Sequence, residues 1–116
     1  IYMQYKRYDE AIGELQLAGK DPRFKISALT NIGRCMIAQN NPQMAINQFK
    51  RAREGVELFE KYREPMYFEA VAYHALGDKQ SLQQALELFT KLYEVDIKFR
   101  DVKDRVEKIN AAIGQA

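Results

Sequence analysis

The fold is decided by residues 29–52, which read LTNIGRCMIAQNNPQMAINQFKRA. Apolar and small residues recur every three or four positions on both sides of Asn40-Asn41-Pro42, as in two amphipathic helices joined by a tight turn. Pro42 suits the first turn of the second helix, where its missing N–H leaves no gap, and Asn41 is the expected N-cap. The apolar positions are Leu29, Ile32, Gly33 and Met36 in the first helix and Ala45, Phe49 and Ala52 in the second.

The second helix of this unit has counterparts on both sides. Three of its apolar positions occur 34 residues earlier, and three occur 40 residues later. Equal offsets at several positions indicate an internal repeat, in which neighbouring helix pairs together bury a continuous core. The earlier matches are Ala11, Leu15 and Ala18, and the later ones are Ala85, Phe89 and Leu92.

Breakers and apolar periodicity place the first three helices. A helix is expected at 2–18, ended by Gly19 and Asp21-Pro22, and a second at about 25–39. The apolar period of the third persists past Gly55 to Phe59. We therefore predict a single long helix that continues to about residue 63 and is broken at Glu64-Pro65.

The remaining chain contains a third unit and a final helix. Met66, Ala70 and Tyr73 continue the buried stripe, and an enlarged turn is expected between Gly77 and residue 84, because the offset here exceeds the repeat. A last helix is expected at about 101–112, with Asp101 as its cap. Its apolar stripe consists of Val102, Val106, Ile109 and Ile113.

These positions resemble the tetratricopeptide repeat (TPR) family, which is built from 34-residue helix–turn–helix units. The positions quoted from 29–52 match the family pattern, but Glu69 stands where the third unit should have leucine, and Lys6 replaces the glycine of the first. The segment DIKFRDV at 96–102 is similar to the ending of many bacterial TPR proteins, with Ile97 in place of proline. The third unit matches at Tyr73, Gly77-Asp78, Ala85 and Phe89.

The resemblance implies an all-α fold, in which helix–turn–helix repeats stack into a right-handed superhelix with a C-terminal capping helix. A single domain is expected over 1–116, with a truncated first repeat at 1–24, a second at 25–63, a third at 64–98 and the capping helix at 99–116. Because the first residues already resemble the end of a helix, we interpret the chain as a fragment of a longer protein.

Composition argues against several classes of function. The 18 Lys and Arg residues nearly balance the 16 Asp and Glu residues, and the basic run at 50–53 is followed at once by Glu54 and Glu57, so no nucleic-acid partner is expected. No apolar run is long enough for membrane insertion. Cys35 is the only cysteine, which excludes an internal disulfide and fits a reducing compartment, so a cytoplasmic location is expected.

No enzyme activity, cofactor or metal is expected. A nucleophilic site would have to use Cys35 and His74, which lie on different predicted helices with no third group to orient them. A single histidine and a single cysteine are also too few for a convincing zinc site. A packed thiol and an ordinary surface histidine explain both residues better.

A protein or peptide partner is the favoured ligand. By the family's layout, the first helices of the units line a concave groove that suits an extended peptide or a partner helix. A clamp for a terminal carboxylate, known in some TPRs, is disfavoured because Phe68 stands where arginine is needed. The expected contacts are Ser27, Thr30, Asn31, Arg34 and Ile37 from the second unit and Tyr67, Phe68, Val71 and His74 from the third.

Two alternatives remain open. The same face could only pack on further repeats or on a neighbouring domain. In a second reading, the truncated first unit exposes Tyr2, Tyr5 and Ile12, and copies of the chain stack edge to edge to bury them.

Overall fold

The computed structural model describes the backbone of residues 2–114 and the side chains of residues 7–114. This part of the chain is all-α, with no strand among its elements. The side chains of Tyr2 and Tyr5 lie outside the described set. The elements are α1 (Tyr2–Ala18), a 3₁₀ turn η1 (Pro22–Phe24), α2 (Lys25–Ala38), α3 (Pro42–Arg53), α4 (Phe59–Leu76), α5 (Lys79–Val95) and α6 (Val102–Gly114).

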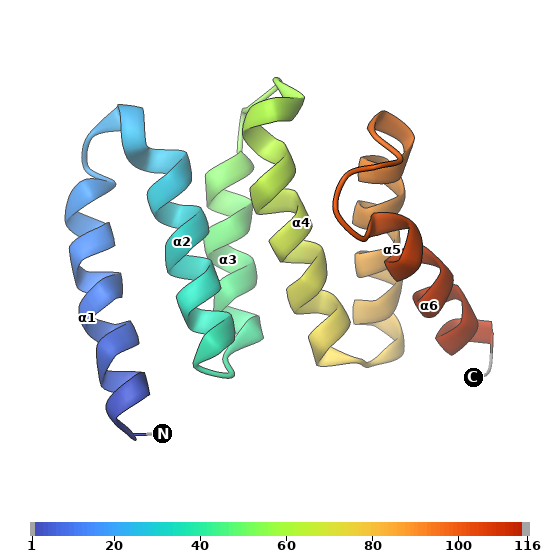
Figure 1. The fold of residues 1–116 in the computed structure, drawn as a ribbon, viewed down its shortest axis with the longest axis horizontal. Helices are drawn as coiled ribbons and strands as arrows, with labels where there is room; N and C mark the ends of the chain where they lie inside the picture. Colours follow the sequence, from blue (N-terminus) through green and yellow to red (C-terminus); the bar gives the residue numbers. More distant parts are fainter. Residues whose placement is uncertain (1, 115–116) are drawn as a thin grey trace.

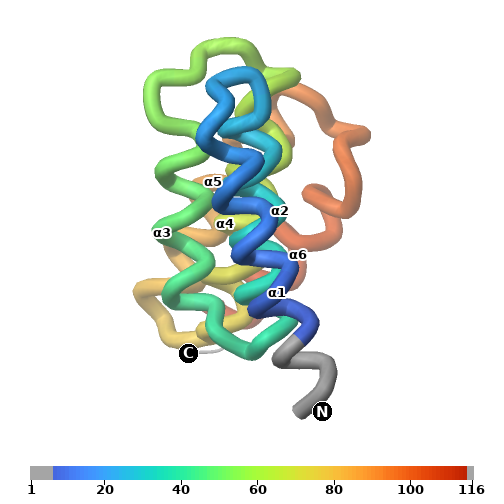
Figure 2. Tube along the Cα trace, turned by 90° about the vertical axis from the view of Figure 1, so that its left-hand side faces the viewer, coloured from blue at the N-terminus to red at the C-terminus, as the bar shows by residue number. Residues whose placement is uncertain are grey.

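The helices stand side by side and alternate in direction, with the two ends of the chain at opposite ends of the row (Figure 1). Each helix packs on the next one along the chain, and α4 contacts α2 as well as α3. Seen along the row, α3 and α6 lie on opposite sides of the molecule (Figure 2). The principal dimensions are 42 × 35 × 21 Å.

A small apolar cluster joins α2 to α3. Ile32 and Met36 pack on Ala45 and Phe49, and α1 adds the half-buried Ile12 and Leu15. A Cβ atom at Gly33 would lie 2.5 Å from two ring carbons of Phe49, so glycine is required where α2 crosses this ring. The predicted pairing of residues 29–52 is therefore confirmed.

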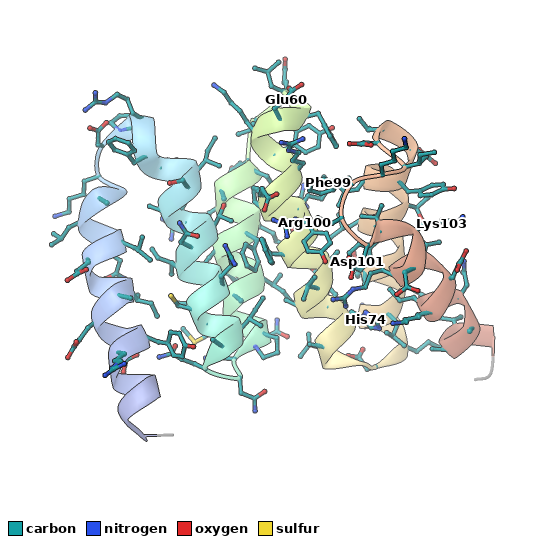
Figure 3. All side chains as sticks on the ribbon, in the orientation of Figure 1. Glu60, His74, Phe99, Arg100, Asp101 and Lys103 are labelled. Atoms are coloured by element: carbon teal, nitrogen blue, oxygen red, sulfur yellow. The ribbon has the colours of Figure 1, made fainter. Side chains whose placement is uncertain are left out.

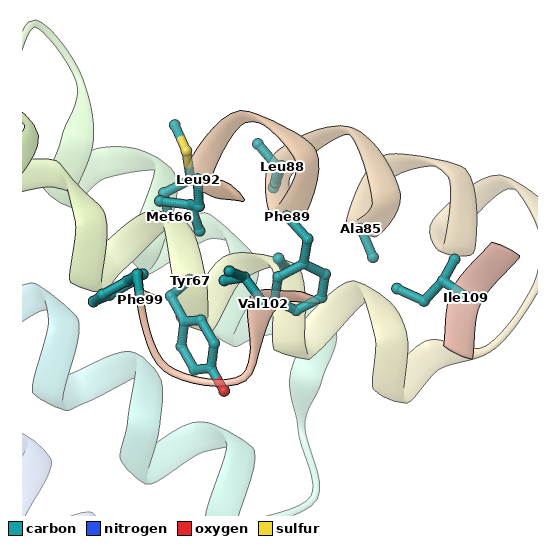
Figure 4. Close-up of a cluster of buried hydrophobic side chains, with 10 residues drawn as sticks. Met66, Tyr67, Ala85, Leu88, Phe89, Leu92, Phe99, Val102 and Ile109 are labelled. Carbon is teal, nitrogen blue, oxygen red and sulfur yellow. The ribbon is translucent and has the colours of Figure 1, made fainter. Parts of the chain in front are cut away.

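A larger cluster joins α4, α5 and α6. Its centre holds Phe89, Leu92, Val102 and Ile109, all fully buried, and Tyr67 packs beside them with its hydroxyl directed out of the cluster (Figure 4). Phe99 enters from the segment between α5 and α6. The expected apolar stripe of the final helix is thus confirmed at Val102 and Ile109, while Val106 and Ile113 are half-buried against the same cluster.

The predicted long helix at 42–63 is wrong. The helix α3 ends at Arg53, and Gly55 adopts a left-handed conformation with φ of +73° that stops it. The next helix starts at Phe59 and continues through Pro65 instead of ending there. Proline leaves the carbonyl of Lys61 without a helical donor, but the Pro65 ring is fully buried, which offsets part of that cost.

The predicted enlarged turn near Gly77 is also wrong. Gly77 ends α4 with φ of +79°, and Asp78 caps α5 directly by accepting a hydrogen bond from the Ser81 amide, so the additional residues extend a helix. Two expected caps differ as well. The Asn41 side chain makes no cap hydrogen bond, and the Asp101 carboxylate contacts other side chains, described below.

Candidate functional site

A cleft of about 490 Å³ lies between α2 and the first half of α4. We call it the central cleft. Its α2 wall is polar and its α4 wall is charged, so it offers hydrogen bonds and ion pairs rather than an apolar floor. The lining residues include Ile26, Ser27, Thr30, Asn31 and Arg34 from α2 and Glu60, Lys61, Glu64 and Pro65 from α4.

Arg34 is the cation that the central cleft presents most directly. Its side chain is exposed, and its guanidinium carbon lies 4.7 Å from the centre of the Phe68 ring. Such stacking fixes the guanidinium in place while its N–H groups stay free to donate. Among the described side chains, no carboxylate is paired with it. Arg34 therefore has the position and the unused donors to bind an acidic group.

Arg100 lies at the far side of the same cleft wall. It pairs with Glu64 at 2.6 Å, from Nη2 to Oε2, and its guanidinium lies 5.0 Å from the Tyr67 ring and 5.2 Å from the Phe68 ring. Figure 3 shows Phe99, Arg100 and Asp101 in front of α4. Arg100 has a φ of +46°, unusual for a side-chain-bearing residue, and this turn lets Phe99 and Val102 both enter the core.

A polar chain connects α4 to α6 beside this turn. The Tyr67 hydroxyl donates to the Asp101 carboxylate at 2.5 Å, and Arg105 donates to Asp101 at 3.2 Å. Arg105 also contacts Nδ1 of His74 at 2.8 Å. Because arginine can only donate, this ring nitrogen must accept, so His74 is neutral in this arrangement.

The surroundings shift three pKa values in this chain. Burial raises the pKa of Tyr67, and its bond to Asp101 raises it further. Burial also lowers the pKa of His74, and the positive charges of Arg105 and Lys108 add to that effect. Burial alone would raise the pKa of Asp101, but the bonds from Tyr67 and Arg105 outweigh it and lower that pKa. The chain thus favours a neutral histidine and an ionised aspartate.

A buried ion pair links α3 to α4. Arg53 donates through Nε to Glu69 at 2.6 Å and through Nη2 at 3.2 Å, and Glu69 is 1% exposed. The bond to Glu69 raises the pKa of Arg53. This contact explains the carboxylate that stands at a position where the repeat pattern calls for leucine.

The nine predicted contacts fall into two groups. The central cleft brings together Ser27, Thr30, Asn31 and Arg34, although Thr30 is mostly buried and donates to the Ile26 carbonyl at 2.7 Å. The others lie outside it. Tyr67 is buried, and the half-buried members are Ile37 beside the α2–α3 cluster, Phe68 under Arg34 and Arg100, Val71 beside the α4–α6 cluster and His74 against Arg105.

Four functional candidates were missed from the sequence. Glu60, Lys61 and Glu64 belong to the cleft because α4 begins at Phe59, whereas the predicted break at Pro65 placed them on another helix. Arg100 reaches the cleft wall only through a contact 36 residues away in the sequence, which helical periodicity does not report.

The two residues considered for catalysis have different neighbours. Burial raises the pKa of the Cys35 thiol, and His74 contacts Arg105 on α6. Within the described residues, no group of three His, Cys, Asp or Glu side chains is arranged to hold a metal ion. No described helix is both long and apolar enough to cross a membrane.

No protein-family model matches the chain, and no curated protein or solved structure does so either. The candidate site therefore rests on its own geometry.

Proposed function

We propose that the chain is a non-catalytic protein-interaction module that binds a peptide or a partner helix in the central cleft. The observation that carries this proposal is the exposed, stacked Arg34 on one wall of a cleft of about 490 Å³. We further propose that the helices form a TPR-like right-handed superhelix. The constant sequence offsets and the packing of α4 on both α2 and α3 support that architecture.

The chemistry of the cleft specifies its ligand. Arg34 would bind an Asp or Glu side chain of the peptide through charge-assisted hydrogen bonds. The exposed Asn31 beside it can donate to and accept from a peptide backbone. Glu60 and Lys61 on the opposite wall provide one charge of each sign, which would fix the direction of the bound chain.

The test is a selection of linear peptides from a random display library on the immobilised protein. We expect the selected peptides to carry an acidic residue. Fluorescence anisotropy should show that Arg34→Gln weakens their binding about 10-fold, as expected for loss of a charge-assisted hydrogen bond. The cleft-blocking variant Ser27→Trp, at an exposed position, should abolish it.

Lys91→Trp on the exposed face of α5 is the matched control and should bind as the unmodified protein does. Selected peptides without acidic residues, or equal binding to Ser27→Trp, would contradict the proposal. Circular dichroism establishes that each variant keeps its helical content.

A further inference from the structure

A second groove, of about 730 Å³, lies between α1 and α2 at the N-terminal end of the row. We call it the edge groove. Small and apolar side chains line most of it, with Glu14 on the α1 wall and Arg34 and Asn31 where it adjoins the central cleft. The apolar lining consists of Ala11, Leu15 and Ala18 from α1 and Cys35 and Ala38 from α2.

The α1 wall of the edge groove matches a fully covered surface elsewhere in the chain. Ala11, Leu15 and Ala18 precede their counterparts on α3 by 34 residues. Those counterparts are at most 2% exposed, whereas Ala18 is exposed and Ala11 and Leu15 are only half-buried. The same pattern of side chains is thus covered on α3 and uncovered on α1. The counterparts are Ala45, Phe49 and Ala52.

The cover on α3 is a helix. Ile32 and Met36 of α2 pack on Ala45 and Phe49, and Gly33 allows the two backbones to approach. The corresponding side of α1 has α2 on one flank only, and the space on the other flank is the edge groove. An occupant that repeats the packing of α2 on α3 is therefore an amphipathic helix.

We propose that the edge groove binds one amphipathic helix of a partner protein, seated on α1 as α2 is seated on α3. Leu15 is smaller than its counterpart Phe49, so the helix needs a side chain larger than glycine at its centre. Glu14 replaces Gln48, which lines a pocket together with Lys25 at the start of α2. A basic residue near the start of the bound helix would therefore meet Glu14.

A second copy of the chain fits this groove less well. At the other end of the row, the outward face of α6 presents Lys103, Asp104, Glu107 and Lys108, all of them exposed, so it offers no apolar stripe to a neighbour. Burying these charges against the alanines of the edge groove would be unfavourable. Charge and apolar pattern together favour a foreign helix over head-to-tail stacking.

The probe is a fluorescent peptide that reproduces residues 25–38, with Gly33→Ala and Cys35→Ala. A hydrocarbon staple between positions 27 and 31 enforces helicity, because an isolated helix of this length is marginal. Both stapled positions are exposed in the chain itself. Circular dichroism of the peptide verifies that it is helical before binding is measured by anisotropy.

We expect saturable binding that is weakened about 10-fold or more by Ala18→Glu and by Ala38→Glu, each of which places a charge in the groove. Both alanines are exposed, so both variants should fold. Glu14→Lys should weaken binding by roughly 2- to 5-fold. The matched control Ala111→Glu, on the exposed face of α6, should bind normally.

Three results would overturn the proposal. One is that the helical peptide does not bind, and another is that Ala18→Glu and Ala38→Glu bind it as well as the unmodified protein. The third is a concentration-dependent dimer in sedimentation equilibrium that Ala18→Glu abolishes, which would assign the groove to a second copy. Ser27→Trp should leave this binding intact, so failure here is distinguishable from failure of the central cleft.

Discussion

The two halves of the molecule are packed to different degrees. The buried cluster of the α4–α6 half contains residues from all three helices and the intervening turn, whereas that of the α1–α3 half comes from α2 and α3 only. None of the described side chains of α1 is fully buried. The comparison teaches that stability concentrates at the C-terminal end and that unsatisfied apolar surface concentrates at the N-terminal end.

The difference has a clear structural cause. On α4, the segment before α6 covers the aromatic residues, with Phe99 packed on Tyr67 and Arg100 over Phe68. On α2, no described element covers the corresponding side, and a groove remains. Surfaces for partners are therefore expected where the chain does not cover itself.

The largest contrast is expected from truncating one matched residue in each half. Phe89→Ala should lower the free energy of unfolding by about 4 kcal/mol, because the ring is fully buried and a cavity would remain. Leu15→Ala, at the matching position of half-buried α1, should cost only about 1 kcal/mol. Urea unfolding followed by circular dichroism measures both, and equal losses would contradict the proposed difference between the halves.

The contact between the halves should show the next largest effect. Arg53→Met removes the partner of a carboxylate that is 1% exposed and should cost about 2–3 kcal/mol, less than for a fully buried pair because Arg53 is partly solvated. The double variant Arg53→Met/Glu69→Leu should recover most of that loss, since no unpaired charge remains. A double variant as unstable as the single one would show that the pair itself contributes the stability.

The smallest effect is expected from pH. The pKa of His74 is lowered in the folded chain, so the unfolded chain binds a proton more readily as the pH falls below 6.5, the ordinary value, toward the folded pKa. Stability should therefore fall in that window as α6 loses its neutral acceptor for Arg105. His74→Gln keeps an acceptor but does not titrate, so it should lose less stability between pH 7 and pH 5.

Thermal unfolding at both pH values measures that difference. Because the chain has one histidine, an NMR titration reports His74 without ambiguity. A midpoint at or above 6.5 would contradict the expected direction of the pKa shift.

Helical periodicity predicted most of the fold but not its irregular junctions. The spacing around Gly33 gave the α2–α3 pair correctly, because small and apolar residues at helical intervals have few other uses. Gly55 could not be assigned in the same way, since glycine in a helix and glycine with positive φ are identical in sequence. Pro65 was misassigned because burial of its ring, a tertiary effect, tolerates it inside α4.

The candidate site was less predictable than the fold. Asn31 and Arg34 were placed on the cleft because their position follows from the register of a single helix. Tyr67 and His74 were expected on an open groove, yet both contact the segment that includes α6, at separations of 34 and 31 residues. A contact of that range depends on where the last helix docks, which no local pattern specifies.

The Arg53–Glu69 pair also affects the entropy of recognition. The central cleft has α2 from one cluster as its first wall and α4 from the other as its second, so its width depends on how firmly the clusters are joined. The ion pair, with the stacked rings of Phe49 and Phe68 nearby in the sequence of contacts, holds α3 and α4 together. A peptide would then enter a cleft whose walls are already in position, and little conformational freedom would be lost on binding.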